Sequence, residues 1–293
     1  MTRALNRTDT SSTDAPTRRR THPSTSKGTG GPRLRKWLKH CLGLLVFKSG
    51  LHRLLLRGKA VVSVFHRVDD SLEGNPISCT TEEFHAFCRF FRRHMEVISL
   101  GELLDRLDRG DRIGSALVIS FDDGYRDNRH AAAPILKKEG LSATFFVTTG
   151  LIGSAAIPWW DAERNIDSRW MSWEDVRELV AMGFEVGAHT VSHADLSEVG
   201  GAEARAEILG SRDRLEKELG VAVPLFSYPY GREDQISDEN RAVIRDEGFR
   251  CCLSAFGGFV EEDSDPFELR RLPVSPWYMS PYHFGWEMLF RNK

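Results

Sequence analysis

Two adjacent carboxylates, Asp122 and Asp123, follow an apolar run over residues 116–121. Consecutive residues of a strand point to opposite faces, so adjacent acids at a strand end diverge and can take different tasks. Further along the chain, His189 and His193 follow a second short apolar run. One carboxylate and two imidazoles can hold a divalent metal with one position left open. These residues therefore predict a metal centre with a second carboxylate free to handle a proton.

Each of these signals is weak alone, because Asp-Asp-Gly is common in turns and a His-x-x-x-His pair often lies on a helix surface. Together, at the ends of two strands in one array, they indicate one chemistry. A zinc-like ion with three protein ligands keeps a position for water and lowers the pKa of that water toward ~7. It also polarises a carbonyl group, and this combination suits the hydrolysis of an amide or ester.

Length and charge limit the remaining function classes. The 293 residues, 41% of them apolar, are enough for one large domain. Residues 1–59 hold 14 Lys/Arg and two acids, a balance of +12, while residues 60–293 hold 26 basic and 40 acidic residues, a balance of −14. A basic arm on an acidic body indicates contact with a polyanion or an anionic membrane. The acidic body argues against nucleic-acid binding as the main function.

The N-terminal segments are read by composition. Residues 1–33 are rich in Ser, Thr, Arg, Pro and Gly, so we predict a disordered basic arm. Residues 34–58 read as an amphipathic helix, which either lies on an anionic bilayer or packs on the catalytic domain of residues 60–293. An uncleaved or unusual export signal is a third alternative. The longest uncharged run, residues 41–47, is far below the roughly 20 residues of a membrane span. We therefore expect no transmembrane helix or cleaved signal, and a cytoplasmic or peripheral inner-membrane protein.

From residue 60 onward, apolar strands alternate with helical patterns, which predicts a parallel sheet covered by helices. The expected strands are residues 61–65, 116–121, 143–148, 184–188, 225–228, 249–254 and 270–274. The expected helices are residues 82–94, 100–107, 129–139, 173–182, 203–219 and 238–246. About seven strands suggest an α/β barrel, whose functional residues lie at the C-terminal ends of its strands. The odd number of cysteines favours five small core side chains over a disulfide framework.

Four motifs make the chain resemble the polysaccharide deacetylase family, also called the NodB-homology family or carbohydrate esterase family 4. They are FDDG (121–124), ATFFV (143–147), HTVSH (189–193) and SYPYG (227–231). The resemblance covers about residues 60–275 and implies a distorted (β/α)7 barrel. It further implies a hydrolase that removes N-acetyl groups from GlcNAc-type sugars, as in exopolysaccharide biosynthesis.

The resemblance also assigns roles to residues. It implies that Asp122 is the general base and that Asp123, His189 and His193 are the ligands of a divalent metal. Zn²⁺ is the simplest choice for this ligand set, with Co²⁺, Ni²⁺ or Fe²⁺ as alternatives. The resemblance makes the backbone N–H of Tyr230 an oxyanion donor, and such a donor is worth ~2.7–4 kcal/mol.

The chain departs from the family pattern at two places. Ser227 stands where many members carry an arginine that orients the base, and Arg271 is our candidate for that role. The usual Leu-x-x-His segment for the general acid is missing, but His66 ends an apolar strand that resembles the opening strand of the poly-N-acetylglucosamine deacetylase branch. In a closed barrel the first and last strands are neighbours, so His66 can fill the same place and protonate a leaving amine.

Aromatic side chains are candidates for sugar contacts. Trp159 and Trp160 lie in a long insertion and either stack on a sugar or anchor their own loop. Tyr228 is a third candidate, and the aromatic tail of residues 277–286 either lines the same groove or docks on the barrel.

Three functions are compatible with the sequence. The first is a glycan N-deacetylase. The second keeps the metal centre but acts on a lipid-linked sugar, as a deacetylase or deformylase, or on a non-sugar amide at the membrane surface. The third is a glycan-binding module without activity, which is disfavoured because the base and all three metal ligands are present.

Overall fold

The computed structural model describes residues 31–291, with side chains for residues 33–290. The predicted disorder of residues 1–33 therefore lies outside the described residues, except that residues 31–33 already belong to helix α1 (Gly31–Lys48). None of the helices in the described part of the chain combines the length and apolar character needed to cross a bilayer.

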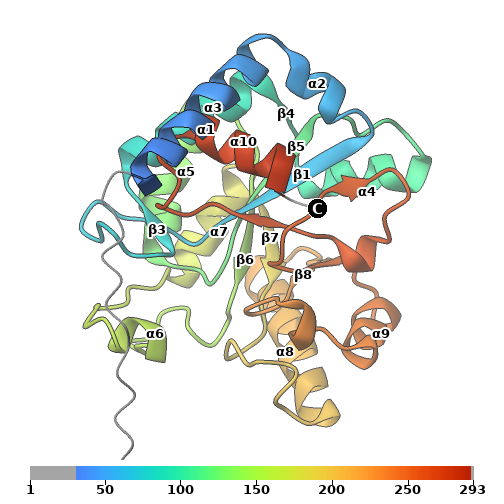
Figure 1. Cartoon of the computed structure of the whole chain (residues 1–293). Coiled ribbons are helices and arrows are strands. Elements are labelled where there is room, and N and C mark those ends of the chain that lie inside the picture. The colour runs from blue at the N-terminus through green and yellow to red at the C-terminus, as the bar shows by residue number, and fades with distance from the viewer. Residues whose placement is uncertain (1–30, 292–293) are drawn as a thin grey trace, which may run out of the picture.

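A curled sheet of parallel strands forms the centre of the fold (Figure 1). In the described part of the chain, the strands run β11, β1, β5, β6, β7, β8 and β9, each parallel to the next. Their bounds are Leu272–Pro273, Lys59–Phe65, Ala116–Phe121, Thr144–Val147, Glu185–Ala188, Leu225–Ser227 and Cys251–Leu253. Each coincides with one of the seven predicted runs, which confirms the predicted strands and the α/β class.

Short strands extend this sheet. Strand β4 (Glu96–Val97) pairs with β5, and β10 (Val260–Glu261) runs antiparallel to β1. Strands β2 (Arg67–Val68) and β3 (Ser78–Cys79) form a separate small pair just beyond the end of β1.

The apolar runs become strands that are buried on both faces. Every residue of β5 is buried, and alternate residues enter different clusters: Leu117 and Ile119 join one, whereas Ala116 and Val118 join the other. This division follows from the two-residue repeat of a strand. It explains why β5 reads as a continuous apolar run, as expected for a parallel strand covered on both sides.

The segment 269–273 connects the two ends of the curled sheet. Leu269 forms a parallel bridge with Leu253 of β9, and three residues later Leu272 pairs with Ser63 of β1. This bridging segment completes the distorted (β/α)7 barrel that the sequence predicts. The arrangement also places Arg271 between the first and last strands of the ring.

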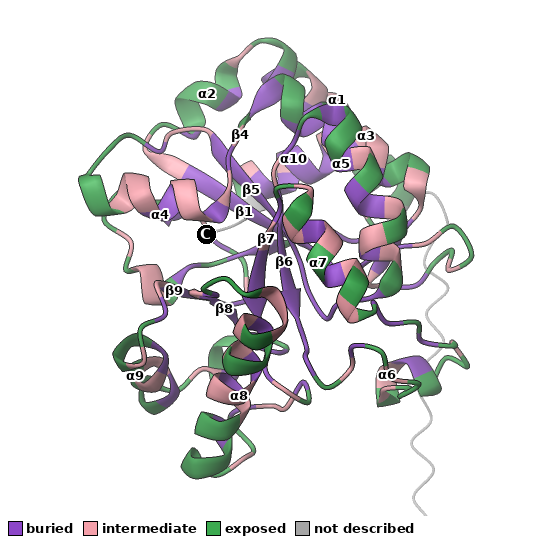
Figure 2. Cartoon of the chain, turned by 180° about the vertical axis from the view of Figure 1, so that it is seen from behind, coloured by how far each residue is buried: buried purple, intermediate pink, exposed green. Residues whose placement is uncertain are grey.

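Helices cover the outside of the sheet (Figure 2). They are α3 (Thr81–His94), α4 (Leu100–Arg109), α5 (Ala133–Glu139), α7 (Trp173–Ala181), α8 (Gly201–Leu219) and α9 (Asp238–Asp246). All six match predicted helices, although residues 128–132 form a π-helical turn, η1, ahead of α5. Local chemistry fixes their starts: Thr80 and Glu83 form a capping box at α3, and Ser172 and Asp175 form one at α7.

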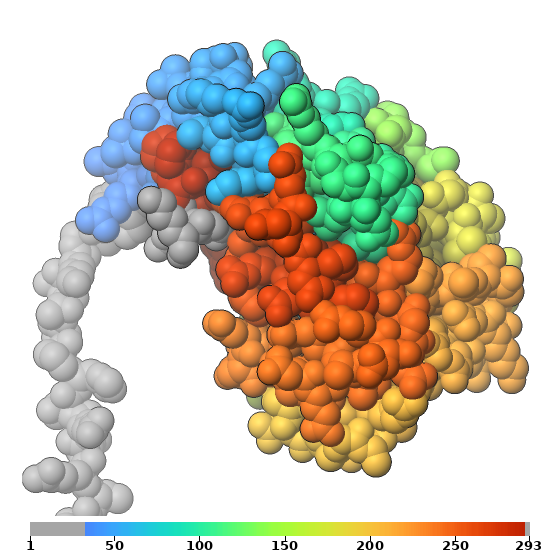
Figure 3. All heavy atoms as spheres, turned by 90° about the vertical axis from the view of Figure 1, so that its right-hand side faces the viewer, coloured from blue at the N-terminus to red at the C-terminus, as the bar shows by residue number. Residues whose placement is uncertain are grey.

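The N-terminal helices and the C-terminal helix α10 (Pro281–Arg291) lie against each other (Figures 1 and 3). Two glycines permit the close approach. A Cβ on Gly43 would lie 2.0 Å from the carbonyl oxygen of Tyr282, and one on Gly285 would lie 2.5 Å from the Phe47 ring. Residues 34–58 were expected either to lie on a bilayer or to pack on the catalytic domain. One face of α1 packs on the domain, against α10. The aromatic tail docks here, on α1 and α3, through residues such as Tyr282.

The cysteines behave as predicted. None of the five forms a disulfide, and all except the half-buried Cys41 are buried. Burial raises the pKa of the Cys79, Cys88 and Cys251 thiols, so they are inert core side chains.

Candidate active site

The carboxyl ends of the parallel strands meet at one edge of the sheet, and the predicted site residues converge there. Asp122 and Asp123 directly follow β5, and both are only 2% exposed. The Asp122 N–H donates to the Phe65 carbonyl at 3.0 Å and so continues the pairing of β5 with β1. Asp123 then turns away with φ of 74°, a left-handed conformation that costs energy for a non-glycine residue. This turn separates the two carboxylates, as the sequence predicts.

The two histidines belong to a tightly held loop after β7. Thr190 and His193 have φ of 63° and 62°, so the loop folds back and returns His193 toward His189. Glu207 of α8 holds this loop: its carboxylate accepts from the Val191 and Ser192 N–H groups, both at 2.8 Å. Sequence reasoning missed Glu207, because one acid on an exposed helix has no signal that links it to a loop 15 residues away.

Asp123, His189 and His193 form a three-residue cluster. Asp123 Oδ1 lies 3.4 Å from His189 Nε2 and 3.2 Å from His193 Nε2, and the three ligand atoms all lie within 4.8 Å of one another. His189 Nδ1 lies 2.8 Å from the Ser227 carbonyl oxygen, which can only accept a hydrogen bond, so His189 presents the lone pair of Nε2 to the cluster.

The cluster fits a divalent metal. Asp123 Oδ1, which faces both imidazoles, has no hydrogen-bond partner within the described residues, although it is buried. Burial acts to raise the pKa of Asp123, but its contacts with His189 and His193 outweigh burial and lower this pKa well below its ordinary value. An ionised carboxylate and two imidazoles are a donor set that zinc accepts.

Arg271 holds the neighbouring carboxylate in place. Its guanidinium is fully buried and donates two parallel hydrogen bonds to Asp122, at 2.7 and 2.6 Å. It also donates to the Ser254 carbonyl at 2.6 Å and to the Ser227 hydroxyl at 2.7 Å. Ser227, which occupies the family's usual arginine position, therefore contacts the arginine that the chain brings from the bridging segment.

The Asp122 carboxylate is ionised at neutral pH. Burial acts to raise its pKa, but the charge of Arg271 and its hydrogen bonds to Asp122 outweigh burial and lower this pKa from the ordinary value. Asp122 Oδ2 is 4.0 Å from His189 Nε2, farther than either oxygen–nitrogen contact of Asp123 in the cluster. Asp122 is thus next to the three-residue cluster without belonging to it.

His66 follows the last residue of β1, so β1 and β5 bring it and the two carboxylates to the same edge. It is half-buried and lines a cavity of about 220 Å³ together with Asp123, His193 and Tyr230. Burial lowers the pKa of His66, although Asp123 and Asp122 act to raise it. The imidazole is therefore neutral before it receives a proton.

Aromatic side chains form the mouth of this cavity. The Trp160 and Tyr230 rings each lie 4.8 Å from the His193 ring. Trp159 is 58% exposed and its Nε1 donates to the Tyr230 hydroxyl at 3.4 Å. Tyr230 has φ of 58°, the fourth left-handed non-glycine residue at this site. Such strained positions cluster where a fold must aim particular groups.

Tyr228 is not among the described residues that line this cavity, and its role in substrate binding stays a prediction. Successive residues at the end of β8 point to opposite sides. Ser227 points inward to Arg271, so Tyr228 points outward, where it is 1% exposed and lies edge-on to Phe226.

Comparisons with known proteins agree with this geometry. The sequence model of the family described as polysaccharide deacetylase matches residues 109–252. A Bacillus subtilis protein named as a polysaccharide deacetylase, YxkH, is 24% identical over 229 residues, which cover 78% of this chain and 75% of that protein. The poly-β-1,6-N-acetyl-D-glucosamine N-deacetylase of Staphylococcus aureus is 24% identical over 208 residues, 68% of each chain.

Solved structures share the fold. The Streptococcus pyogenes deacetylase PplD superposes with a TM-score of 0.66 at 22% identity, covering 77% of this chain and 96% of PplD. IcaB from Ammonifex degensii also gives a TM-score of 0.66 at 22% identity, covering 79% of this chain and 95% of IcaB. The family model thus identifies residues 109–252 as a polysaccharide deacetylase domain, and the barrel that contains them has the fold of these solved deacetylases.

Proposed function

We propose that this protein is a metal-dependent N-deacetylase of GlcNAc-type poly- or oligosaccharides. One observation carries the proposal: Asp122, fixed by the buried Arg271, lies beside the Asp123–His189–His193 cluster next to an aromatic-lined cavity. The relative from S. aureus, which is named for this reaction on a poly-β-1,6-linked glycan, supports the choice of substrate class.

Asp123, His189 and His193 would hold the metal. Zn²⁺ suits this set best, and Co²⁺, Ni²⁺ or Fe²⁺ also bind such ligands. The metal would lower the pKa of water toward ~7 and polarise the amide carbonyl.

The protein's own groups then move the protons. Asp122, ionised and outside the ligand set, takes the proton of the attacking water. The Tyr230 N–H donates to the oxygen of the tetrahedral intermediate, a contact worth ~2.7–4 kcal/mol. His66, neutral at rest, takes up the proton that Asp122 removed from the water and delivers it to the sugar amine as the C–N bond breaks.

Two alternatives differ only in substrate: a lipid-linked sugar, losing an acetyl or formyl group, and a non-sugar amide. The test is mass spectrometry of products after zinc-loaded protein is incubated with N-acetylated oligosaccharides, lipid-linked sugars and simple amides. We expect a loss of acetyl mass from the oligosaccharides. Acyl loss confined to either other class would overturn the proposed substrate.

We also propose that the outer face of α1 and α2 (Leu51–Leu55) rests on an anionic bilayer, such as the inner membrane. This face consists of eight exposed apolar side chains: Leu34, Trp37, Leu38, Leu42, Leu45, Leu51, Leu54 and Leu55. Residues 31–58 contain seven Arg or Lys and no acid. Apolar side chains flanked only by positive charge complement a negatively charged lipid surface, whereas another protein surface would need matching acids.

A vesicle assay tests this contact. Leu45 and Leu54 are each 66% exposed, so changing both to Ser should leave the fold intact. We expect the wild type to sediment with phosphatidylglycerol-containing vesicles and the double variant to lose most of this binding. The matched control is Val221→Ser, an exposed apolar residue on another face. Unchanged sedimentation of the double variant, or a concentration-dependent dimer that the double variant abolishes, would overturn the membrane proposal.

A further inference from the structure

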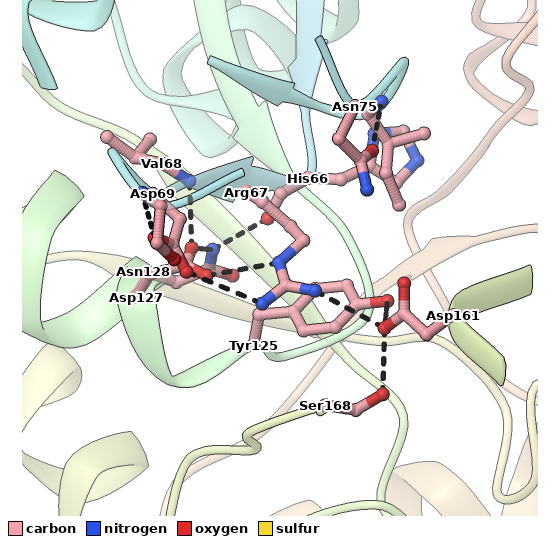
Figure 4. Close-up of polar contacts among 12 residues, drawn as sticks. His66, Arg67, Val68, Asp69, Asn75, Tyr125, Asp127, Asn128, Asp161 and Ser168 are labelled. Atoms are coloured by element: carbon pink, nitrogen blue, oxygen red, sulfur yellow. Dashed lines mark hydrogen bonds and ion pairs between the residues drawn. The ribbon is translucent and has the colours of Figure 1, made fainter. Parts of the chain in front are cut away.

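A buried ion-pair network lies behind the cavity and is not used in the mechanism above (Figure 4). At its centre is Arg67, 3% exposed, with its guanidinium 4.3 Å from the Tyr125 ring centre. The guanidinium lies 3.4 Å from Asp127 on one side and 3.3 Å from Asp161 on the other. A larger hollow of about 660 Å³ adjoins Arg67 and Asp127, whereas Asp161 lines the smaller cavity that contains His66.

Only one oxygen of the Asp161 carboxylate accepts hydrogen bonds from the described residues. Its Oδ2 accepts from Arg67, from the Tyr125 hydroxyl at 3.1 Å and from the Ser168 hydroxyl at 2.7 Å. Its Oδ1 has no hydrogen-bond partner among the described residues, although Asp161 is fully buried. Figure 4 shows this second oxygen pointing away from Arg67, on the side where His66 and Asn75 lie.

A second unpartnered group belongs to the same cavity wall. Asn75 is 7% exposed, and its Oδ1 accepts from the Ile77 N–H at 3.0 Å. Its Nδ2 has no partner within the described part of the chain. Asn75 and Asp161 both line the cavity with His66 and Asp123. The wall therefore offers one fixed acceptor and one fixed donor.

Unpaired buried polar atoms are costly, and a hydrogen bond to a charged group is stronger than one between neutral groups. Three donors to Oδ2 hold Asp161 in a single orientation, so its Oδ1 needs no reorganisation to accept a hydrogen bond. A sugar hydroxyl both donates and accepts, which matches this pair, whereas an acetyl methyl group matches neither atom.

We propose that Asp161 and Asn75 form a polar subsite that binds a hydroxyl group of the sugar whose acetamido group faces the metal cluster. This inference rests on the proposed function, which it deepens by naming the residues that distinguish a sugar from a simple acyl compound. Asp161 accepts the hydroxyl proton, and Asn75 Nδ2 donates to the hydroxyl oxygen. The hydrogen bond from Arg67 holds the Asp161 carboxylate in this orientation.

Two isosteric variants test the subsite. Asp161→Asn keeps an oxygen for Arg67, Tyr125 and Ser168 but replaces the free acceptor with a donor. Asn75→Asp keeps the acceptor for the Ile77 N–H but replaces the free donor with an acceptor. The control is Asp167→Asn, in the same loop. It also replaces a carboxylate with an amide, but its side chain is 77% exposed and does not line the cavity.

Each zinc-loaded variant is assayed on a β-1,6-linked GlcNAc pentamer and on 4-methylumbelliferyl acetate, an ester without sugar hydroxyls. We expect KM for the pentamer to rise at least tenfold in Asp161→Asn and in Asn75→Asp, with ester hydrolysis within twofold of wild type and the control unchanged. Unchanged KM for the pentamer, or equal losses on both substrates, would overturn the subsite.

A binding measurement separates this subsite from the proposed reaction. If wild-type protein hydrolyses the ester but leaves the pentamer acetylated, the proposed substrate class fails. The subsite is then judged by tryptophan fluorescence titration with the same pentamer. A Kd at least tenfold weaker in Asp161→Asn supports it, and equal Kd values or no binding overturn it.

Discussion

The pair formed by Arg271 and Asp122 allows a quantitative test of how the candidate base is held. Both side chains are buried, at 0% and 3% exposure, and two hydrogen bonds join them. Removing one member of a buried ion pair leaves the other charge uncompensated and costs about 3–5 kcal/mol. Arg271→Met and Asp122→Asn should therefore each lower the free energy of unfolding by about that amount.

The double variant carries the decisive information. If each charge mainly compensates the other, removing both should lower the free energy of unfolding little more than removing one. The double-mutant cycle then gives a coupling energy of about 3–5 kcal/mol. If they act independently, the costs should add. The measurement is urea unfolding followed by tryptophan fluorescence, with EDTA present so that bound metal does not contribute.

An exposed ion pair provides the control for this cycle. Arg245 and Asp265 lie 2.6 Å apart, but their side chains are 48% and 41% exposed. Such pairs contribute about 0–1 kcal/mol, so the cycle of Arg245→Met and Asp265→Asn should show a coupling energy in that range. Coupling at Arg271–Asp122 no larger than at the exposed pair would show that Arg271 does not hold Asp122 through a buried ion pair. Arg271→Lys should lose most turnover, because an ammonium cannot donate the two parallel hydrogen bonds.

Three further predictions follow from the same contacts. Burial raises the pKa of Asp127 to about 6, so its contribution to stability is fully present below the unfolded pKa near 4 and is lost as the pH rises through 6. When the pH is lowered from 7 to 4, the wild type should therefore gain about 2–3 kcal/mol of unfolding free energy relative to Asp127→Asn, which cannot titrate at this position. A difference between the two proteins that does not change with pH would contradict this. Glu207→Ala should weaken zinc binding about 10–100-fold in equilibrium dialysis, because the loop that carries His193 loses its clamp; equal affinities would contradict that role. Dialysis against EDTA should abolish deacetylation and added Zn²⁺ should restore it; activity that survives complete removal of the metal would exclude a metal-dependent reaction.

The barrel was predictable because its parallel strands are buried on both faces. The run over residues 116–121 reads as continuous apolar sequence for that reason, and its end marks the position of Asp122 and Asp123. The helix boundaries were also readable, since capping residues such as Thr80 and Ser172 act within four residues of sequence. These features depend on local chemistry, which a single sequence contains.

Other features depend on contacts between distant residues. Helix α10 was not predicted: its sequence starts at Pro281 and contains Gly285, which usually disfavours a helix interior, yet Gly285 is required by the approach of Phe47. Two partners of Arg67, Asp127 and Asp161, lie 60 and 94 residues away along the chain, and no spacing in the sequence connects them to Arg67. Tyr228 belongs to the SYPYG motif but does not line the cavity, because the side of the strand end on which a residue lies decides its environment.

In the proposed mechanism, Asp122 takes the proton of the attacking water, while Asp123, His189 and His193 hold the metal. The most direct test is Asp122→Asn, with zinc measured by elemental analysis and turnover measured by mass spectrometry of a GlcNAc oligosaccharide. We predict that this variant binds as much zinc per chain as the wild type and releases no detectable acetate. Loss of zinc from the variant, or turnover close to that of wild type, would contradict the claim.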